Sequence, residues 1–214
     1  MPQTRDIVRS FIISIMTAFF ILPFIYNNLQ ARISFSKGAV FAVIILPVVS
    51  LAGLFIAKIL SKYFAPFWRL AKFIQLGVLN TIIDIGTFNV ITFFTNTTSG
   101  VLIGGVNAPG FIIAVTNSYL WNKFWVFEDN AEKRSYSDFW LFLVVSVTSL
   151  FVNSLIVFVV TTHIPHALGL NDIQWANLGK GIASIASFIW NFTGYKLFVF
   201  VKPATPQGVP PATA

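Results

Sequence analysis

The chain has no cysteine and very little charge. Only 7 of its 214 residues are Asp or Glu, and charged residues make up 10% of the total. Without cysteine, disulfides, thiol catalysis and cysteine-held zinc are excluded. A low charged fraction, 56% hydrophobic residues and a mean hydropathy of +0.79 are not typical of a soluble domain. The composition therefore predicts an integral membrane protein.

Familiar catalytic motifs are also missing. The sequence has no Ser/His/Asp set, carboxylate pair, glycine-rich phosphate loop or nucleotide motif. His163 and His166 lie close together, but Pro165 breaks helical spacing and no acidic or thiol ligand lies beside them. We therefore expect no enzyme activity, no catalytic residue, no cofactor and no metal. We also expect no nucleic acid partner, because the basic residues are placed as in a membrane topology.

Long apolar runs recur along most of the chain. A membrane-spanning helix needs about 20 mostly apolar residues. The segments that qualify are residues 11–29, 39–60, 73–94, 106–127, 139–162 and 177–200. The sequence thus predicts an all-α membrane protein with six transmembrane helices.

Basic residues gather on one side of these predicted spans. Eleven of the fourteen Lys and Arg fall in the N-terminus, in alternate loops or at the C-terminal end: Arg5, Arg9, Lys58, Lys62, Arg69, Lys72, Lys123, Lys133, Arg134, Lys196 and Lys202. The positive-inside rule then predicts that both termini are cytoplasmic. Residues 203–214 hold four prolines and no apolar periodicity, which predicts a disordered tail.

A ten-residue motif occurs twice, each time at the end of an apolar run. Residues 118–127 (Ser-Tyr-Leu-Trp-Asn-Lys-Phe-Trp-Val-Phe) align without a gap with residues 191–200 (Asn-Phe-Thr-Gly-Tyr-Lys-Leu-Phe-Val-Phe). The duplication predicts two like-oriented hairpins, spans three with four and five with six, with a ligand site commonly at the interface between such repeats. Spans one and two lack the motif and buried ionisable residues. We expect them to form an N-terminal hairpin and linker over residues 1–69.

Each of the last four spans carries a stripe of polar or small residues on one helical face. The stripes consist of Gly77, Thr81 and Asp84, with Asn80 at their edge; Asn107, Gly110, Ala114 and Ser118; Ser146, Ser149 and Asn153; and Lys180, Ser184, Ser187 and Asn191. Polar groups that face lipid are costly. The four stripes should therefore face one another.

Four charged residues in or beside these spans each have more than one interpretation. Asp84 lies about 18 Å beyond Lys72 along a helix and is either a functional carboxylate or a structural partner of a neighbouring helix. Lys180 could bind a phosphate, pair with Asp84 or extend to the outer headgroups. Lys123 and Lys196, each among aromatic residues, could be interfacial anchors or could receive an anionic headgroup.

Several of these segments together resemble the GtrA-like family. They are residues 73–84, the two copies of the ten-residue motif, and residues 178–184, so that the resemblance covers about residues 70–202. The matching positions are Gly77, Asn80, Asp84, Ser118, Asn122, Lys123, Lys180, Asn191 and Lys196. The chain departs from the family pattern at Ser118 and Tyr195, where Asn is expected. These departures indicate that the two repeats are not used symmetrically.

The resemblance implies a four-helix transmembrane domain over residues 70–202, in a bacterial inner membrane. It also implies a role in cell-surface polysaccharide synthesis as a flippase of polyprenyl-phosphate-linked sugars. The substrate-binding residues we expect are Lys180, Asp84, Asn80, Lys123, Lys196, Asn191, Asn122, Ser187 and Ser184.

Two other functions are compatible with the sequence. The first is a proton-coupled exporter of organic cations that uses Asp84, and the second is a non-transporting partner of a membrane glycosyltransferase. A homodimer is possible for any of the three functions, because six spans are few to enclose a path.

Overall fold

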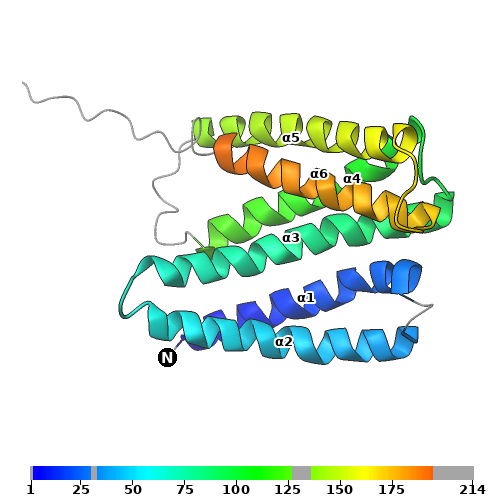
Figure 1. Ribbon diagram of the computed structural model, residues 1–214. Coiled ribbons are helices and arrows are strands. Elements are labelled where there is room, and N and C mark those ends of the chain that lie inside the picture. The colour runs from blue at the N-terminus through cyan, green and yellow to red at the C-terminus, as the bar shows by residue number, and fades with distance from the viewer. Residues whose placement is uncertain (1, 30–32, 127–135, 195–214) are drawn as a thin grey trace, which may run out of the picture.

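A computed structural model describes residues 2–29, 33–126 and 136–194, and these residues are helical apart from short connections (Figure 1). The elements are α1 (Thr4–Leu29), α2 (Phe35–Leu60), α3 (Pro66–Thr95), α4 (Leu102–Trp121), the π-helix η1 (Asn122–Val126), α5 (Tyr136–His163) and α6 (Asp172–Gly194). Each predicted span overlaps one α-helix, and the all-α prediction is confirmed. The predicted tail, and residues 195–200 of the second motif copy, lie outside the described residues.

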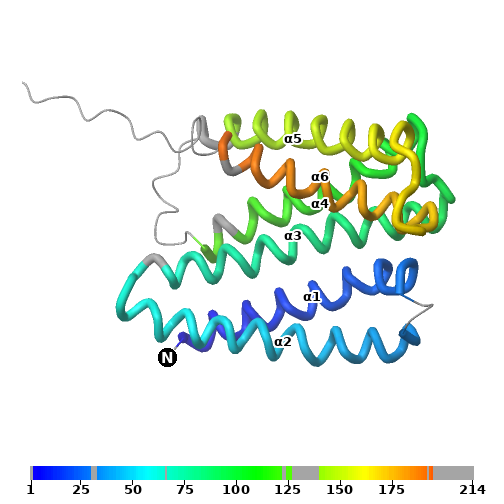
Figure 2. Tube along the Cα trace, in the orientation of Figure 1, coloured from blue at the N-terminus to red at the C-terminus, as the bar shows by residue number. Residues whose placement is uncertain are grey.

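The helices form an antiparallel bundle around α3 (Figure 1, Figure 2). The α1–α2 hairpin packs on one side of α3, while α4 packs on another side and contacts α5. The last two helices pair closely, and α6 also contacts α3. The start of α1, the end of α2 and the start of α3 lie at one end of the bundle, and the α3–α4 and α5–α6 connections lie at the other (Figure 1).

Among the residues that the structure describes, four helices are long and apolar enough to cross a membrane. They are Thr4–Leu29, Phe35–Leu60, Phe67–Thr95 and Trp140–His163. Many large apolar side chains on them point outward, as for Phe41 of α2 at 64% exposure and Phe151 of α5 at 71%. Such a surface suits lipid rather than water. The protein is an integral membrane protein.

The other two helices, α4 and α6, are not among these four, and both carry polar side chains along their length. Asn107 and Asn117 lie in α4, and Asn177 and Lys180 lie in α6. Asn107 and Lys180 are fully buried in the bundle. Their polarity lowers the average hydropathy of these helices, although the polar groups face other helices.

The N-terminal hairpin docks on α3 through a close backbone approach. A Cβ atom added at Gly86 of α3 would overlap the carbonyl oxygen of Phe20 in α1. Hydrogen bonds add to this contact, because Ser10 donates to the Gln75 side chain at 2.8 Å and Asn27 donates to the Asn89 backbone oxygen at 3.0 Å. The hairpin is therefore joined to α3 by direct backbone packing and by polar contacts.

Candidate functional site

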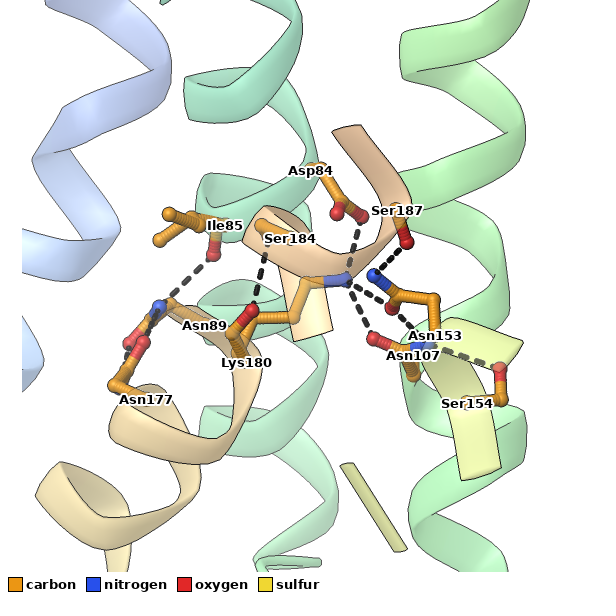
Figure 3. A network of polar contacts seen from close by, with 10 residues as sticks. All are labelled: Asp84, Ile85, Asn89, Asn107, Asn153, Ser154, Asn177, Lys180, Ser184 and Ser187. Carbon is orange, nitrogen blue, oxygen red and sulfur yellow. Dashed lines mark hydrogen bonds and ion pairs between the residues drawn. The ribbon is translucent and has the colours of Figure 1, made fainter. Parts of the chain in front are cut away.

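The strongest polar feature inside the bundle is an ion pair between α3 and α6. Lys180 Nζ lies 2.7 Å from Asp84 Oδ1 (Figure 3). The Lys180 side chain is 0% exposed and that of Asp84 is 8% exposed. Of the alternatives open from the sequence, the structure adopts the one in which Asp84 and Lys180 are partners.

Two asparagines complete the surroundings of the Lys180 ammonium. It donates to Asn107 Oδ1 of α4 and, at 3.5 Å, to Asn153 Oδ1 of α5. An ammonium has three donors and no acceptor, so three oxygens can satisfy it fully. Burial of a charge is tolerated when it is both paired and hydrogen-bonded. One carboxylate and two amide oxygens thus compensate the buried ammonium of Lys180.

The same asparagines bond to each other and to two serines. Asn107 Nδ2 donates to Asn153 Oδ1 at 2.8 Å and to Ser154 Oγ at 2.9 Å. Asn153 Nδ2 donates to Ser187 Oγ at 2.9 Å (Figure 3). The network therefore ties all four helices, α3 through α6, at one level. We call Asp84, Asn107, Asn153, Lys180 and Ser187 the central network.

Gly110 allows α4 to approach the ion pair. A Cβ atom added there would lie 2.6 Å from the backbone oxygen of Asp84 and 2.9 Å from its Oδ1. Any larger residue would push α4 away from α3. Because Asn107 lies one helical turn before Gly110, this close approach also brings the Asn107 amide within reach of Lys180.

The central network contains three of the nine predicted site residues, Asp84, Lys180 and Ser187. Ser184 lies beside it and donates to the backbone oxygen of Lys180 at 2.9 Å. Asn80 lies elsewhere, since it accepts a hydrogen bond from Asn117 of α4 at 2.7 Å. The structure thus brings Asp84, Lys180 and Ser187 together and leaves Asn80 in a separate contact.

The remaining predicted residues belong to the repeated motif. The side-chain oxygen of Asn191 is buried and has no hydrogen-bond partner in the part of the chain that the structure describes. The side chains of Asn122 and Lys123 and the whole of Lys196 lie outside the described residues. The backbone of Asn122 and Lys123 begins η1, so residues 122–126 of the first motif copy form a π-helix.

Asn107 and Asn153 were placed in polar stripes but not among the predicted ligands. One signal in the sequence does point to Asn107. The offset that aligns Ser118 with Asn191 also aligns Asn107 with Lys180. The repeat therefore puts an amide in one hairpin where the other has an ammonium, and the structure brings the two into contact.

A second buried ion pair at one end of the bundle was not expected from the sequence. Lys72 Nζ of α3 lies 2.7 Å from Asp6 Oδ1 of α1, and Trp125 Nε1 of η1 donates to the same oxygen at 3.0 Å. Asp6 lies before the predicted first span, residues 11–29, but α1 begins earlier, at Thr4, and includes Asp6 in its first turn. A carboxylate there is favoured by the helix dipole.

Comparison with known proteins adds the family. No curated protein and no solved structure matches the chain. A family model described as GtrA/DPMS, transmembrane domain, matches residues 72–200, which is more than half of the chain and contains the whole central network. The match begins within α3 and leaves out α1 and α2. The chain belongs to the GtrA/DPMS transmembrane domain family.

Proposed function

We propose that the protein is a flippase of polyprenyl-phosphate-linked sugars in cell-surface polysaccharide synthesis. The observation that carries this proposal is the fully buried ammonium of Lys180 among carboxylate, amide and hydroxyl groups. A sugar phosphate that crosses about 30 Å of hydrocarbon needs a cation and polar partners on its way, whereas the polyprenyl chain can stay in lipid. The central network offers both kinds of group.

The proposal requires that all six helices cross the membrane. Polar residues in α4 and α6 do not prevent this, because Asn107 and Lys180 bond to neighbouring helices. The described basic residues also support the orientation. Six of them lie at the bundle end where α1 and α3 begin (Arg5, Arg9, Lys58, Lys62, Arg69 and Lys72), while Lys37 lies near the start of α2. We propose that the end with six cations, and with it both termini, is cytoplasmic.

In the proposed cycle, substrate phosphate and Asp84 compete for Lys180. Without substrate, the carboxylate and two amide oxygens hold the ammonium. A phosphate that reaches Lys180 replaces the Asp84 carboxylate, and the freed amide and hydroxyl groups of Asn107, Asn153 and Ser187 bond to the sugar hydroxyls. The binding energy of the phosphate thus offsets the loss of the internal ion pair.

Lys180 is completely buried, so this exchange needs an opening of the bundle. Packing is extensive within the α3–α4 pair and within the α5–α6 pair, and less extensive between the two pairs. The bundle should therefore open between the pairs, which are the two repeats. The central network spans this seam and would break as the pairs separate.

The structure favours an anionic substrate over an organic cation. An exporter of cations needs Asp84 to be available, but Lys180 already occupies that carboxylate at 2.7 Å. A cationic drug would have to displace the ammonium and then remain next to it, at a cost in like-charge repulsion. A phosphate, by contrast, is attracted to the ammonium.

Translocation by the purified protein in proteoliposomes tests the proposal. Single truncations would leave a buried charge without a partner and could unfold the protein. The informative variant is Asp84→Asn with Lys180→Gln, which removes both charges together. We expect an unchanged fold, judged by thermal unfolding in detergent, and at least about a tenfold lower rate for a polyprenyl-phosphate-linked hexose. Thr116→Val, on the exposed surface of α4, serves as the control and should transport normally.

One result would contradict the role of the ion pair, and another would contradict the flippase itself. A fully active double variant would show that the ion pair only stabilises the bundle and takes no part in translocation. If the unaltered protein moves no lipid-linked sugar but raises the activity of an added membrane glycosyltransferase, the protein is instead a non-transporting partner.

A further inference from the structure

Two buried polar atoms, one in α5 and one in α6, have no hydrogen-bond partner in the described part of the chain. They are the hydroxyl oxygen of Ser149 and the amide oxygen of Asn191. Ser149 is 0% exposed. Buried polar atoms are nearly always hydrogen-bonded, and one without a partner costs free energy. Two such atoms at one place would indicate a position for a polar ligand.

The packing of α5 against α6 places these two residues opposite each other. The helices are antiparallel, and Asn153 Nδ2 donates to Ser187 Oγ at 2.9 Å. Ser149 lies four residues before Asn153, and Asn191 lies four residues after Ser187. The helices remain in contact beyond this level, because a Cβ atom added at Gly194 would lie 2.7 Å from a side-chain atom of α5. Since residues four apart share a helical face, Ser149 and Asn191 lie side by side on the faces that carry Asn153 and Ser187.

This level lies close to the Lys180 ammonium, on one side of it. The ammonium donates to Asn153 Oδ1 at 3.5 Å, and Ser149 is one helical turn, about 6 Å, from Asn153 along α5. The turn leads toward the end of the bundle where α1 and α3 begin (Figure 1). A phosphate bound to Lys180 could therefore place an attached sugar ring next to Ser149 and Asn191.

The hydroxyl of Ser149 does not use the partner that its own helix offers. Thr148 and Thr161 of α5 each donate to the backbone oxygen four residues earlier, at 2.8 and 2.7 Å. Such bonds are common for hydroxyl residues inside helices. Ser149 Oγ makes no bond of this kind, so its hydroxyl remains available to a ligand.

The chemistry of the two groups favours a neutral hydroxyl over a phosphate. The Asn191 oxygen can only accept a hydrogen bond, whereas the Ser149 hydroxyl can donate or accept. The oxygens of an ionised phosphodiester carry no proton and cannot donate to Asn191. A sugar hydroxyl can donate to Asn191 and accept from Ser149, and it brings no charge into a buried place.

We propose that Ser149 and Asn191 form a subsite for a hydroxyl group of the substrate sugar, which we call the sugar subsite. It rests on the proposed function, because it binds the sugar while Lys180 holds the phosphate of the same molecule. Ser149 was not among the nine predicted site residues. The sugar subsite shares its helical faces with Asn153 and Ser187, so it becomes accessible with the central network when the two repeats separate.

Native mass spectrometry of the full chain in detergent tests the sugar subsite. The probes are decaprenyl phosphate linked to glucose and decaprenyl phosphate without a sugar. Ser149→Ala should lower the affinity for the glucose-bearing lipid about fivefold, which corresponds to the loss of one neutral hydrogen bond. The affinity for decaprenyl phosphate should not change. Asn191→Leu, which keeps the approximate shape of the side chain, should show the same selective loss.

The matched control is Thr148→Val, one position from Ser149. It removes a hydroxyl that already bonds to the backbone oxygen of Val144, and it should bind both lipids as the unaltered protein does. Thermal unfolding provides a second readout. Ser149→Ala removes a hydroxyl without a partner, so the unfolding temperature should stay the same or rise slightly.

Four results would overturn the sugar subsite. A clear fall in the unfolding temperature of Ser149→Ala would show that the hydroxyl stabilises the fold. Equal losses of affinity for both lipids would place the effect on the phosphate or the polyprenyl chain. An unchanged preference for the glucose-bearing lipid in both variants would mean that the two groups hold something else, such as a water molecule. An unaltered protein that binds both probes equally well would have no sugar subsite.

Failure of the sugar subsite and failure of the flippase proposal can be told apart, because one is measured by binding and the other by transport. A protein that binds the glucose-bearing lipid through Ser149 but does not translocate it contradicts only the flippase. A protein that translocates this lipid, with unchanged affinity in Ser149→Ala, contradicts only the sugar subsite.

Discussion

Two aspartate–lysine pairs have the same length and very different surroundings. In both, the lysine nitrogen lies 2.7 Å from a carboxylate oxygen. Around Asp84 and Lys180 the other partners are neutral amide oxygens from α4 and α5. Around Asp6 and Lys72 the other neighbours are tryptophan rings and further cations.

The residues around an ion pair, more than the distance between its nitrogen and oxygen atoms, decide what the pair can do. At the centre, every donor of the ammonium has an oxygen, so no charge is left to attract a ligand until the network opens. At the end, Asp6 Oδ1 accepts from Lys72 and from the Trp125 indole, and the ammonium groups of Lys58 and Lys72 lie over the same ring of Trp68. The central pair is therefore enclosed by neutral partners, whereas the end pair lines a cavity of about 160 Å³ where α1 and α3 begin and α2 ends, which we call the end cavity.

The largest expected effect is that of Lys180→Ala. This change leaves the Asp84 carboxylate buried without a partner, and we expect a loss of about 3–5 kcal/mol in the free energy of unfolding. Chemical denaturation of the detergent-solubilised protein measures it. Adding Asp84→Asn to the same chain should restore most of the loss, and no recovery in that double variant would speak against an electrostatic origin.

A smaller effect is expected for Gly110→Ala. The new methyl group would collide with the backbone of Asp84, and the resulting shift of α4 should cost about 1–3 kcal/mol. Gly104→Ala in the same helix is the control, because a Cβ atom there meets nothing within 4 Å. The control should be neutral or slightly stabilising. Similar losses at both positions would mean that α4 does not depend on this close approach.

Asp6→Asn should cost less than the central truncation, about 1–2 kcal/mol, because water and headgroups can reach the lysine that it leaves unpaired. Chemical denaturation in detergent measures this loss. A loss as large as that of Lys180→Ala would show that the two pairs do not differ in how well their surroundings can compensate an unpaired charge.

The smallest effect is expected for a neutral hydrogen bond between α3 and α4. Asn117→Ala removes the 2.7 Å hydrogen bond to Asn80, and such bonds in membrane proteins average about 0.6 kcal/mol. Thermal unfolding should show only a slight shift. A loss as large as that of Lys180→Ala would place Asn80 and Asn117 in the same cooperative unit as the ion pair.

The helices and the stripes could be predicted because both depend on local spacing. Apolar runs long enough to span a bilayer gave all six helices, and the 100° periodicity put Asp84 and Lys180 on facing stripes. The hydrogen bonds of Asn107 and Asn153 were harder to predict, since a neutral amide in a helix can serve many partners. Only the internal repeat, which aligns Asn107 with Lys180, singles out one of them.

The end cavity could not be predicted from local spacing. Asp6 and Trp125 are separated by 119 positions, and Lys58 reaches the cavity from a different helix. Each residue taken alone has an ordinary explanation, as a helix-start acid, an interfacial ring or a topology-setting lysine. Only the packing of α1, α2 and α3 shows that these residues line one space.

Asn89 of α3 links the matched family domain to the N-terminal hairpin. Its side-chain oxygen accepts from Asn27 and Asn28 of α1 and from Asn177 of α6. A polar position inside the matched domain is thus satisfied partly by α1, a helix that the family model does not include. Relatives without such a hairpin would expose this amide to lipid, so we expect covariation, with an apolar residue at position 89 wherever α1 is absent. An alignment of relatives with and without the hairpin would test this.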